Sequence, residues 1–255
     1  MSRYFRVEIR SNRPVNQNHN ILSLANLDEM TEPIPGQFYM LEVSSGLDPL
    51  LKRAFSLFRR TKDGFQILYR IKGKGTSILK DLEEGTMLNV LGPLGNGYPM
   101  PSDPESPIVI AGGIGIASVF SLVEKLSKKA CVFYGAREEQ ELFMTDALQS
   151  FYRELVLCTD DGSCGVRGTV VDVLSDFIKK QDALHRPVIY ACGPNVMLEE
   201  IAKTAAANGI KAYVSLEEHM ACGIGACLGC VVKTRSGYQR VCKEGPVFDA
   251  REIVW

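Results

Sequence analysis

Cysteine and glycine dominate one segment near the end of the chain, Cys222-Gly223-Ile224-Gly225-Ala226-Cys227-Leu228-Gly229-Cys230, which Cys242 follows. The spacing of the four cysteines is C-x4-C-x2-C-x11-C, and the first three match the plant-type pattern in which thiolates hold a [2Fe–2S] cluster. Glycines between the ligands remove side-chain bulk and let backbone N–H groups point at sulfur. The spacing therefore predicts that Cys222, Cys227, Cys230 and Cys242 ligate one [2Fe–2S] cluster.

A structural zinc site is the alternative for these cysteines. Zinc sites usually pair one C-x-x-C motif with a second one or with two histidines. Here a single C-x-x-C motif stands between an early and a late cysteine, which favours the iron–sulfur interpretation. Disulfides are disfavoured, because half of the eight cysteines lie in one glycine-rich segment of a long chain.

Length, composition and charge limit the classes of function. The 255 residues suggest about two domains, and 45% hydrophobic content is ordinary for a globular protein. A net charge of −1 without a basic block gives no surface for nucleic acid. No apolar run is long enough to cross a membrane. The segment Met1–Arg6 enters a strand-like pattern directly, so we expect no signal peptide and a cytoplasmic protein whose thiols stay reduced.

Residues 1–100 are predicted to form an antiparallel β-barrel, because short apolar or alternating runs are separated by turn signals. The expected strands are 3–10, 21–25, 37–43, 54–59, 65–71 and 86–91. Two segments carry candidate binding residues: Arg53-Ala54-Phe55-Ser56, which enters a strand, and Arg70-Ile71-Lys72-Gly73-Lys74-Gly75-Thr76-Ser77, which leaves one and opens a helix. Free backbone N–H groups and the Thr76 hydroxyl at this helix start form an anion site. The planar guanidinium of Arg53 suits the same pyrophosphate.

A proline-rich segment, 99–107, separates the predicted barrel from a region of strand–helix alternation. This alternation predicts a parallel sheet with crossover helices, and ligands bind beyond the carboxyl ends of such strands. The expected strands are 108–111, 130–134, 155–159, 188–192 and 212–216, and the expected helices are 117–127, 147–153, 170–179 and 195–208. Two of these strands run into Gly112-Gly113-Ile114-Gly115 and Cys192-Gly193-Pro194, which are candidate dinucleotide-binding turns.

The glycine turn is an imperfect G-x-G-x-x-G fingerprint, since Ser118 replaces the third glycine and no acid follows the second strand. The segment after the third strand contains Asp160-Asp161. Two carboxylates repel a 2′-phosphate and accept hydrogen bonds from a ribose diol, so the charge argument favours NAD(H) over NADP(H).

The motifs R-x-F-S at Arg53–Ser56 and K-G-x-G-T-S at Lys72–Ser77 resemble the flavin-binding barrel of the ferredoxin–NADP reductase superfamily. The resemblance implies that Arg53 contacts the FAD pyrophosphate and that Ala54, Phe55 and Ser56 lie along the flavin, with Ser56 near its reactive edge. It also implies that Arg70, Ile71 and Lys72 border the ring or ribityl chain and that Gly75 and Thr76 hold phosphate. The later turns resemble the pyridine-nucleotide part of this superfamily, in which Cys192 and Gly193 lie near the nicotinamide.

The whole chain resembles one family more closely, the electron-transfer subunits of NAD-dependent, type B dihydroorotate dehydrogenases. The segments that carry this resemblance are S-L-E-E-H-M-A-C-G-I-G-A-C-L-G-C at 215–230 and V-C-K-E-G-P-V-F at 241–248, after a barrel (1–100) and a nucleotide part (101–214). It implies a cluster module at 215–255 and a catalytic partner that carries FMN, with two copies of each chain. Electrons are then expected to pass from this FMN through the cluster and FAD to NAD+.

Three other functions remain open at this stage. A reductase subunit of an NADH-dependent ferredoxin or sulfide oxidoreductase has the same motifs. A redox sensor uses the cluster without flavin and nicotinamide sites, and a zinc-stapled interaction module uses the cysteines alone. Glu217 and Glu218 are interpreted as solvated or hinge residues, and His219 as part of the loop edge.

Overall fold

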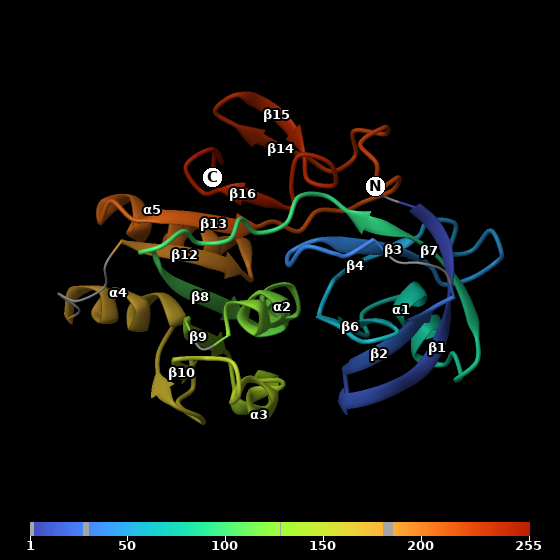
Figure 1. The fold of residues 1–255 in the computed structure, drawn as a ribbon, viewed down its shortest axis with the longest axis horizontal. Coiled ribbons are helices and arrows are strands. Elements are labelled where there is room, and N and C mark those ends of the chain that lie inside the picture. The colour runs from blue at the N-terminus through green and yellow to red at the C-terminus, as the bar shows by residue number, and fades with distance from the viewer. Residues whose placement is uncertain (1–2, 28–30, 128, 181–185) are drawn as a thin grey trace.

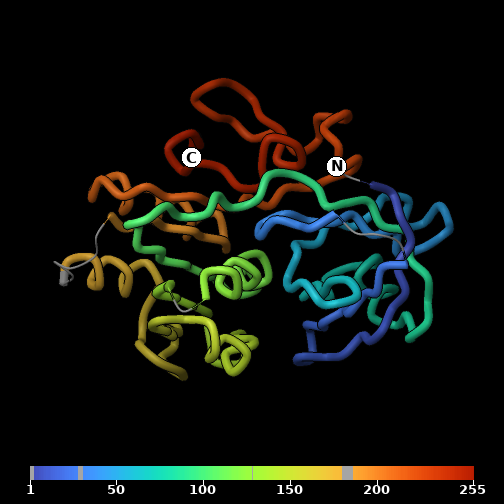
Figure 2. The backbone as a smooth tube through the Cα atoms, in the orientation of Figure 1, coloured from blue at the N-terminus to red at the C-terminus, as the bar shows by residue number. Residues whose placement is uncertain are grey.

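The computed structural model describes residues 3–27, 31–127, 129–180 and 186–255, a range that includes all of the expected N-terminal strand, 3–10. Two large sheets lie side by side, and the C-terminal segment crosses above the place where they meet (Figure 1). Figure 2 shows the chain between the sheets running beneath this segment, and an isolated bridge pairs Asn96 with Pro246 there. No helix in the described ranges is both long and apolar enough to cross a membrane.

The first sheet is antiparallel throughout, with strand order β4-β3-β7-β1-β2-β6-β5. Its strands are β1 (Arg3–Asn16), β2 (His19–Asn26), β3 (Phe38–Glu42), β4 (Arg53–Ser56), β5 (Arg59–Arg60), β6 (Gly64–Arg70) and β7 (Met87–Leu94), with helix α1 (Lys74–Lys80) after β6. Alternate residues such as Val7, Ile9, Leu22 and Leu24 are buried, as the period-2 pattern of half-buried strands requires. The sheet is open between its edge strands β4 and β5, and its buried residues form one core cluster of their own, as in a half-barrel.

The second sheet is parallel except at one edge, with order β11-β10-β9-β8-β12-β13-β16. Its strands are β8 (Ser106–Gly112), β9 (Cys131–Ala136), β10 (Glu154–Thr159), β11 (Val166–Arg167), β12 (Pro187–Cys192), β13 (Lys211–Ser215) and β16 (Val247–Asp249). The helices are α2 (Ile116–Leu126), α3 (Thr145–Leu148), α4 (Val170–Lys180) and α5 (Asn195–Ala207), with 3-10 turns η1 (Gly113–Gly115) and η2 (Glu139–Glu141). Helices α2 and α3 pack with one buried cluster and α4 and α5 with the other, so both faces are covered.

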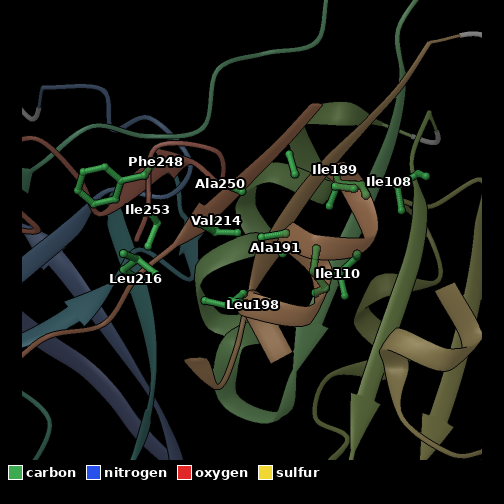
Figure 3. Close-up of a cluster of buried hydrophobic side chains, with 14 of the residues drawn as sticks. Ile108, Ile110, Ile189, Ala191, Leu198, Val214, Leu216, Phe248, Ala250 and Ile253 are labelled. Carbon is green, nitrogen blue, oxygen red and sulfur yellow. The ribbon is translucent and has the colours of Figure 1, made fainter. Parts of the chain in front are cut away.

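The C-terminal segment shares the core of the second sheet. Figure 3 shows Ile110 and Ala191 of the sheet beside Leu198 of α5, with Phe248 and Ile253 from the end of the chain in the same buried cluster. Strand β16 pairs antiparallel with β13, while β14 (Val231–Thr234) and β15 (Gly237–Arg240) form a separate hairpin. The predicted fold class, a barrel followed by an α/β sheet and a small C-terminal module, is confirmed.

One predicted helix is wrong. The sequence indicates a helix at 147–153, but α3 ends at Leu148. The residues after Leu148 make tertiary contacts instead of continuing the helix. The Phe151 ring packs edge-on against Phe120 of α2, with ring centroids 6.5 Å apart. The Arg153 N–H donates to the carbonyl of Ala130, which draws the chain into β10. Strand β16 was not predicted, because its three residues are too few to show an alternating hydrophobic pattern.

Candidate functional site

The segment Cys222–Cys230, called the cluster loop below, lies against the first sheet. Gly223 and Gly225 have φ angles of 71° and 82°, in the left-handed region that favours glycine. A Cβ at Gly223 would lie 2.7 Å from Met40 Cγ, and one at Gly225 would lie 2.8 Å from Lys243 Cδ. Both glycines are therefore required by conformation and by close approach.

Backbone donors surround the sulfur of Cys222. Burial disfavours its thiolate, but hydrogen bonds from the backbone of Cys227, Ile224 and Ala226 and from the Cys227 thiol outweigh burial and lower the pKa of Cys222 to about 6. N–H groups aimed at sulfur are the surroundings that a thiolate ligand needs.

The four cysteines interact with one another, and Cys242 is influenced by both Cys230 and Cys222. Cys222 interacts with Cys227, and the Cys242 N–H donates to Cys230 Sγ at 3.5 Å. Burial, followed by the neighbouring Cys230, raises the pKa of Cys242 to about 12. Four thiolates over two irons are the ligand set of a [2Fe–2S] cluster, so these residues fit that group. In the part of the chain that the structure describes, no group of three or more His, Cys, Asp or Glu side chains has the arrangement that would hold a single metal ion.

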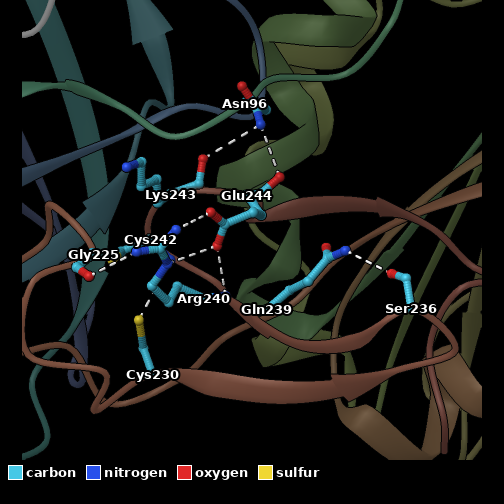
Figure 4. Close-up of polar contacts among 9 residues, drawn as sticks. All are labelled: Asn96, Gly225, Cys230, Ser236, Gln239, Arg240, Cys242, Lys243 and Glu244. Atoms are coloured by element: carbon cyan, nitrogen blue, oxygen red, sulfur yellow. Dashed lines mark hydrogen bonds and ion pairs between the residues drawn. The ribbon is translucent and has the colours of Figure 1, made fainter.

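Arg240 and Glu244 hold the turn that presents Cys242 (Figure 4). Arg240 Nη1 donates to the Gly225 carbonyl at 3.0 Å, and its Nε donates to Glu244 Oε2 at 2.9 Å. The hydrogen bonds that Arg240 makes to the Glu244 carboxylate lower the pKa of Glu244 to about 2. Asn96 Nδ2 donates to the Glu244 carbonyl at 2.8 Å. The cluster loop, the Cys242 turn and the end of the first sheet are thereby joined.

A cavity of about 230 Å³, called the flavin cavity below, lies where the two sheets meet. The first sheet supplies its Ala54–Ser56 and Tyr69–Arg70 walls, while turn η1 and helix α2 supply Ile114 and Ala117. The segment 215–220 closes a further side. Phe55 lies edge-on to Tyr69, with ring centroids 5.7 Å apart. Both sequence segments singled out for flavin binding thus reach one cavity.

Arg53 lies beside the turn that opens α1. A Cβ on Gly75 would come within 2.6 Å of Arg53 Nε, so glycine leaves the space that the guanidinium occupies. The hydroxyl of Thr76 accepts from the Lys72 N–H at 2.9 Å and the Gly73 N–H at 3.1 Å. It is thus engaged within its own turn. A guanidinium beside this uncrowded turn fits a pyrophosphate-bearing group such as FAD.

The neighbouring Ile71 is half-buried against the barrel core, and its N–H donates to the carbonyl of Asn18. Lys72 is exposed. Neither residue lines the flavin cavity.

A second cavity of about 230 Å³, called the dinucleotide cavity below, adjoins the first. It is lined by Gly112–Gly115 after β8 and by Gly193 and Pro194 after β12. These turns are in close contact, since a Cβ at Gly115 would lie 2.2 Å from the Cys192 carbonyl oxygen. Arg70, Ile114 and Glu217 line both cavities. The two cavities therefore adjoin at these three residues.

Cys192 lies behind this wall, with 1% of its surface exposed, and does not line the dinucleotide cavity. Burial raises the pKa of its thiol to about 12 against hydrogen bonds from Ser118 and Ser215. The thiol is therefore neutral at physiological pH. Its predicted place near the nicotinamide stays a prediction.

Asp160 and Asp161 are exposed in the loop after β10, two strands from β8, and outside the dinucleotide cavity. Asp161 Oδ1 accepts from the Ser163 hydroxyl at 2.6 Å and its N–H at 2.9 Å. These bonds lower the pKa of Asp161, which keeps it ionised. Neither acid lines the dinucleotide cavity or the flavin cavity, so their predicted contact with a ribose diol stays a prediction.

Sequence reasoning missed Glu217, His19 and Arg137, which all line the dinucleotide cavity. Glu217 is an exposed residue that lines both cavities, and desolvation by the protein around it raises its pKa against the charge of Lys72. Its position just after β13 is the signal that locates it, because ligands bind at carboxyl ends of parallel strands. His19 and Arg137 carry no such motif.

Comparison with known proteins decides the family. Residues 217–254 match the iron–sulfur cluster binding domain of dihydroorotate dehydrogenase B, and residues 109–203 match the oxidoreductase NAD-binding domain. A protein of Desulforamulus reducens named dihydroorotate dehydrogenase B (NAD(+)), electron transfer subunit, is 38% identical over 87% of both chains. The protein of the same name from Bacillus caldolyticus is 36% identical over 98% of both chains. This chain belongs to that family.

Membership in the dihydroorotate dehydrogenase B electron transfer family confirms the resemblance seen in the sequence. The prediction that the chain is an oxidoreductase component with an iron–sulfur cluster and an NAD-binding part is confirmed as well. The cluster-binding match covers Cys222, Cys227, Cys230 and Cys242. The comparisons assign no role to an individual residue.

Solved structures of other proteins have the same fold as this chain. A chain of an NADH-dependent reduced ferredoxin–NADP oxidoreductase superposes with a TM-score of 0.86 at 24% identity, covering 98% of this chain and 90% of that one. A ferredoxin NADP+ reductase from Neisseria gonorrhoeae with bound FAD and NADP gives 0.69 at 16% identity, covering 81% and 92%. At these identities the likeness shows the fold, and it agrees with the predicted flavoprotein architecture.

Proposed function

We propose that this chain transfers electrons between a dihydroorotate-oxidising partner and NAD+, with FAD and a [2Fe–2S] cluster as its resident groups. The observation that carries this function is the continuity of the sites. The dinucleotide cavity shares three lining residues with the flavin cavity, and the flavin cavity reaches Met220, which only Ala221 separates from Cys222. A hydride acceptor, a flavin and a one-electron carrier placed along these sites stand in series.

The chain's own residues bind and orient the groups. Bound FAD supplies the exchange between a hydride and single electrons, and the cluster carries one electron. The ligand set proposed for the cluster is Cys222, Cys227, Cys230 and Cys242. The set proposed for FAD is Arg53, Ala54, Phe55, Ser56, Arg70, Ile71, Lys72, Gly75 and Thr76. The set proposed for NAD(H) is Gly112, Gly113, Gly115, Asp160, Asp161, Cys192, Gly193 and Pro194.

These sets place FAD in 1–100, NAD(H) in 101–214 and the cluster in 215–255. Ser56 and Gly193 are assigned to the place where hydride moves, since Ser56 lines the flavin cavity and Gly193 the adjoining one. Ionised Asp161 favours NAD(H) over NADP(H) by repelling a 2′-phosphate.

The proposed partner is an FMN-containing dihydroorotate dehydrogenase subunit, with two copies of each chain in the cytoplasm. The exposed rim of the cluster loop supports a contact at this place. Ile224 and Leu228 expose 54% and 59% of their surface, and Gly229 between Leu228 and Cys230 is exposed as well. Exposed apolar side chains around a redox group are typical of a protein-docking site.

The test mixes the chain with an FMN-containing catalytic subunit of a type B dihydroorotate dehydrogenase and follows NADH formation. Alone, the chain is expected to oxidise NADH with artificial acceptors and to leave dihydroorotate unchanged. The mixture is expected to reduce NAD+ with dihydroorotate. Association without coupled turnover contradicts the function, and failure to associate favours the ferredoxin or sulfide oxidoreductase alternative.

A further inference from the structure

One deeply buried imidazole in the dinucleotide cavity comes from the barrel. His19 is the first residue of β2 and exposes 7% of its surface. It lines the cavity together with the glycine turn of the second sheet. Its ring packs on Phe143, with centroids 4.3 Å apart and planes tilted by 41°. The two sheets thus meet at His19, on the edge of the cavity where NAD(H) is proposed to bind.

Neighbouring amides fix the tautomer of this histidine. Asn16 Nδ2 donates to the Gln140 carbonyl at 3.1 Å, and Asn16 Oδ1 accepts from the Asn18 N–H at 2.9 Å. With the amide held in this orientation, Oδ1 also faces His19 Nδ1 at 3.0 Å. The proton therefore lies on Nδ1, and Nε2 carries the lone pair.

The charge state agrees with this assignment. Burial, followed by the charge of Arg70, lowers the pKa of His19 against the opposing charge of Glu141. The ring is therefore neutral at physiological pH. Within the described ranges, no residue hydrogen-bonds to Nε2. Nε2 is not among the fully buried, unpaired polar atoms of the described residues, so this acceptor is open to a donor that enters the cavity His19 lines.

The residues that line the dinucleotide cavity indicate which group of the ligand donates to His19 Nε2. The dinucleotide cavity shares Arg70 and Glu217 with the flavin cavity, so it takes the half of the dinucleotide nearest the flavin. The nicotinamide ring and its carboxamide must reach the flavin cavity, which His19 does not line. The remaining donors in this half are the hydroxyls of the nicotinamide-side ribose.

We propose that His19 binds NAD(H) by accepting a hydrogen bond at Nε2 from a hydroxyl of the nicotinamide-side ribose. This inference rests on the proposed NAD(H) function. It assigns one wall of the nicotinamide-nucleotide site to the barrel, through the β1–β2 turn that Asn16 ties to Gln140. The neutral acceptor complements Arg70 in the same cavity, a cation suited to the adjacent phosphate.

The experiment compares His19→Ala and His19→Gln with wild type, and Asn18→Ala serves as the matched control. Asn18 is exposed in the same turn and contributes its backbone N–H, which the substitution keeps. Calorimetric titration of the FAD-loaded proteins with NAD+, nicotinamide mononucleotide and ADP gives the dissociation constants. Stopped-flow flavin reduction by NADH gives the limiting rate, and flavin absorbance gives FAD content.

His19→Ala is expected to raise the Kd for NAD+ and for nicotinamide mononucleotide by the same factor, about three- to tenfold. ADP binding, FAD content and the limiting rate of reduction stay unchanged. His19→Gln restores part of the affinity through its side-chain oxygen, and Asn18→Ala matches wild type. Unchanged Kd values in His19→Ala, or a loss for ADP equal to that for NAD+, overturn the assignment. A wild-type flavin that NADH fails to reduce overturns the proposed function instead.

Discussion

The cluster loop and the two cofactor cavities are built in opposite ways. All four proposed cluster ligands lie between Cys222 and Cys242, and bonds within that segment, such as Arg240 to Gly225, hold them. The flavin and dinucleotide cavities take their walls from strands of both sheets and from the segment 215–220. A local site is specified by spacing, whereas a composite site is specified by the topology that brings distant segments together.

This difference predicts different responses to substitution. Each thiolate of the cluster loop is essential, because no other residue in the segment replaces a ligand. The cavities distribute binding over many contacts, so one substitution removes a fraction of the affinity. The four predictions below test this contrast in order of decreasing effect.

The largest effect is expected from Cys227→Ser, which removes an exposed ligand without disturbing the core. Iron and labile sulfide are expected to be lost, and coupled dihydroorotate-to-NAD+ turnover to fall about a hundredfold or more. NADH oxidation with a dye should stay within about twofold, because it needs only the cavities. Metal analysis and both assays measure this. Cys164→Ser, at a partly exposed cysteine outside the loop, is the control. Retained iron and sulfide in Cys227→Ser would falsify the ligand assignment.

Arg53→Ala is expected to raise the Kd for FAD about ten- to a hundredfold, because it removes a charge-assisted hydrogen bond. Fluorescence titration of the apoprotein measures this. Thr76→Ala is expected to do less, since its hydroxyl is already engaged by the Gly73 N–H at the start of α1, and the loss of this bond costs about 1 kcal/mol of local stability. Arg60→Ala, at an exposed arginine paired with Glu32, is the control. Equal FAD affinity in Arg53→Ala and Arg60→Ala contradicts the placement of the pyrophosphate.

The same contrast explains what the sequence could predict. The cysteine spacing and the motifs at Arg53–Ser56 and Gly75–Thr76 are local, and the structure brings the two flavin segments to one place. Strand–helix alternation was sufficient for the parallel sheet, and hence for the turns at Gly112–Gly115 and Cys192–Pro194.

Glu217 and His19 were missed for a physical reason. Each belongs to a cavity only because the two sheets pack against each other, and no spacing rule carries that information. Glu217, one of two adjacent acids, resembles a solvated residue, and His19 resembles an ordinary turn histidine. The short α3 was mispredicted because contacts of Phe151 and Arg153 overrode helical periodicity.

A moderate effect is expected from removing the acids beyond the dinucleotide cavity. Wild type should use NADH better than NADPH, and Asp160→Asn with Asp161→Asn should improve kcat/KM for NADPH about fivefold, as expected when close charge repulsion in water is removed. Stopped-flow reduction with each cofactor measures this. The control is Asp176→Asn, at an exposed aspartate on α4. Equal kcat/KM for both cofactors in wild type refutes the charge argument.

The smallest effect on the isolated chain is expected from Gly229→Trp. A Cβ there meets only Cys227 Sγ, at an ordinary 3.6 Å, so the loop should keep its iron and NADH-to-dye activity. Coupled turnover should fall several-fold, because the bulky ring holds the partner away from the cluster. Both activities are compared at equal iron content, with Gly46→Trp as the control, at an exposed glycine outside the cluster loop where a Cβ meets only Ser44 Oγ, also at 3.6 Å. Unchanged coupled turnover places the docking surface elsewhere.

The central claim is that the cavities and the cluster loop form one electron-transfer chain in this protein. An anaerobic titration with NADH, followed by flavin absorbance and by electron paramagnetic resonance of the reduced cluster, tests it most directly. Both signals are expected to change, and reduction is expected to end near 1.5 NADH per chain, about two electrons for FAD and one for the cluster. Flavin bleaching that ends near one NADH per chain, with the cluster still oxidised in excess NADH, would contradict it.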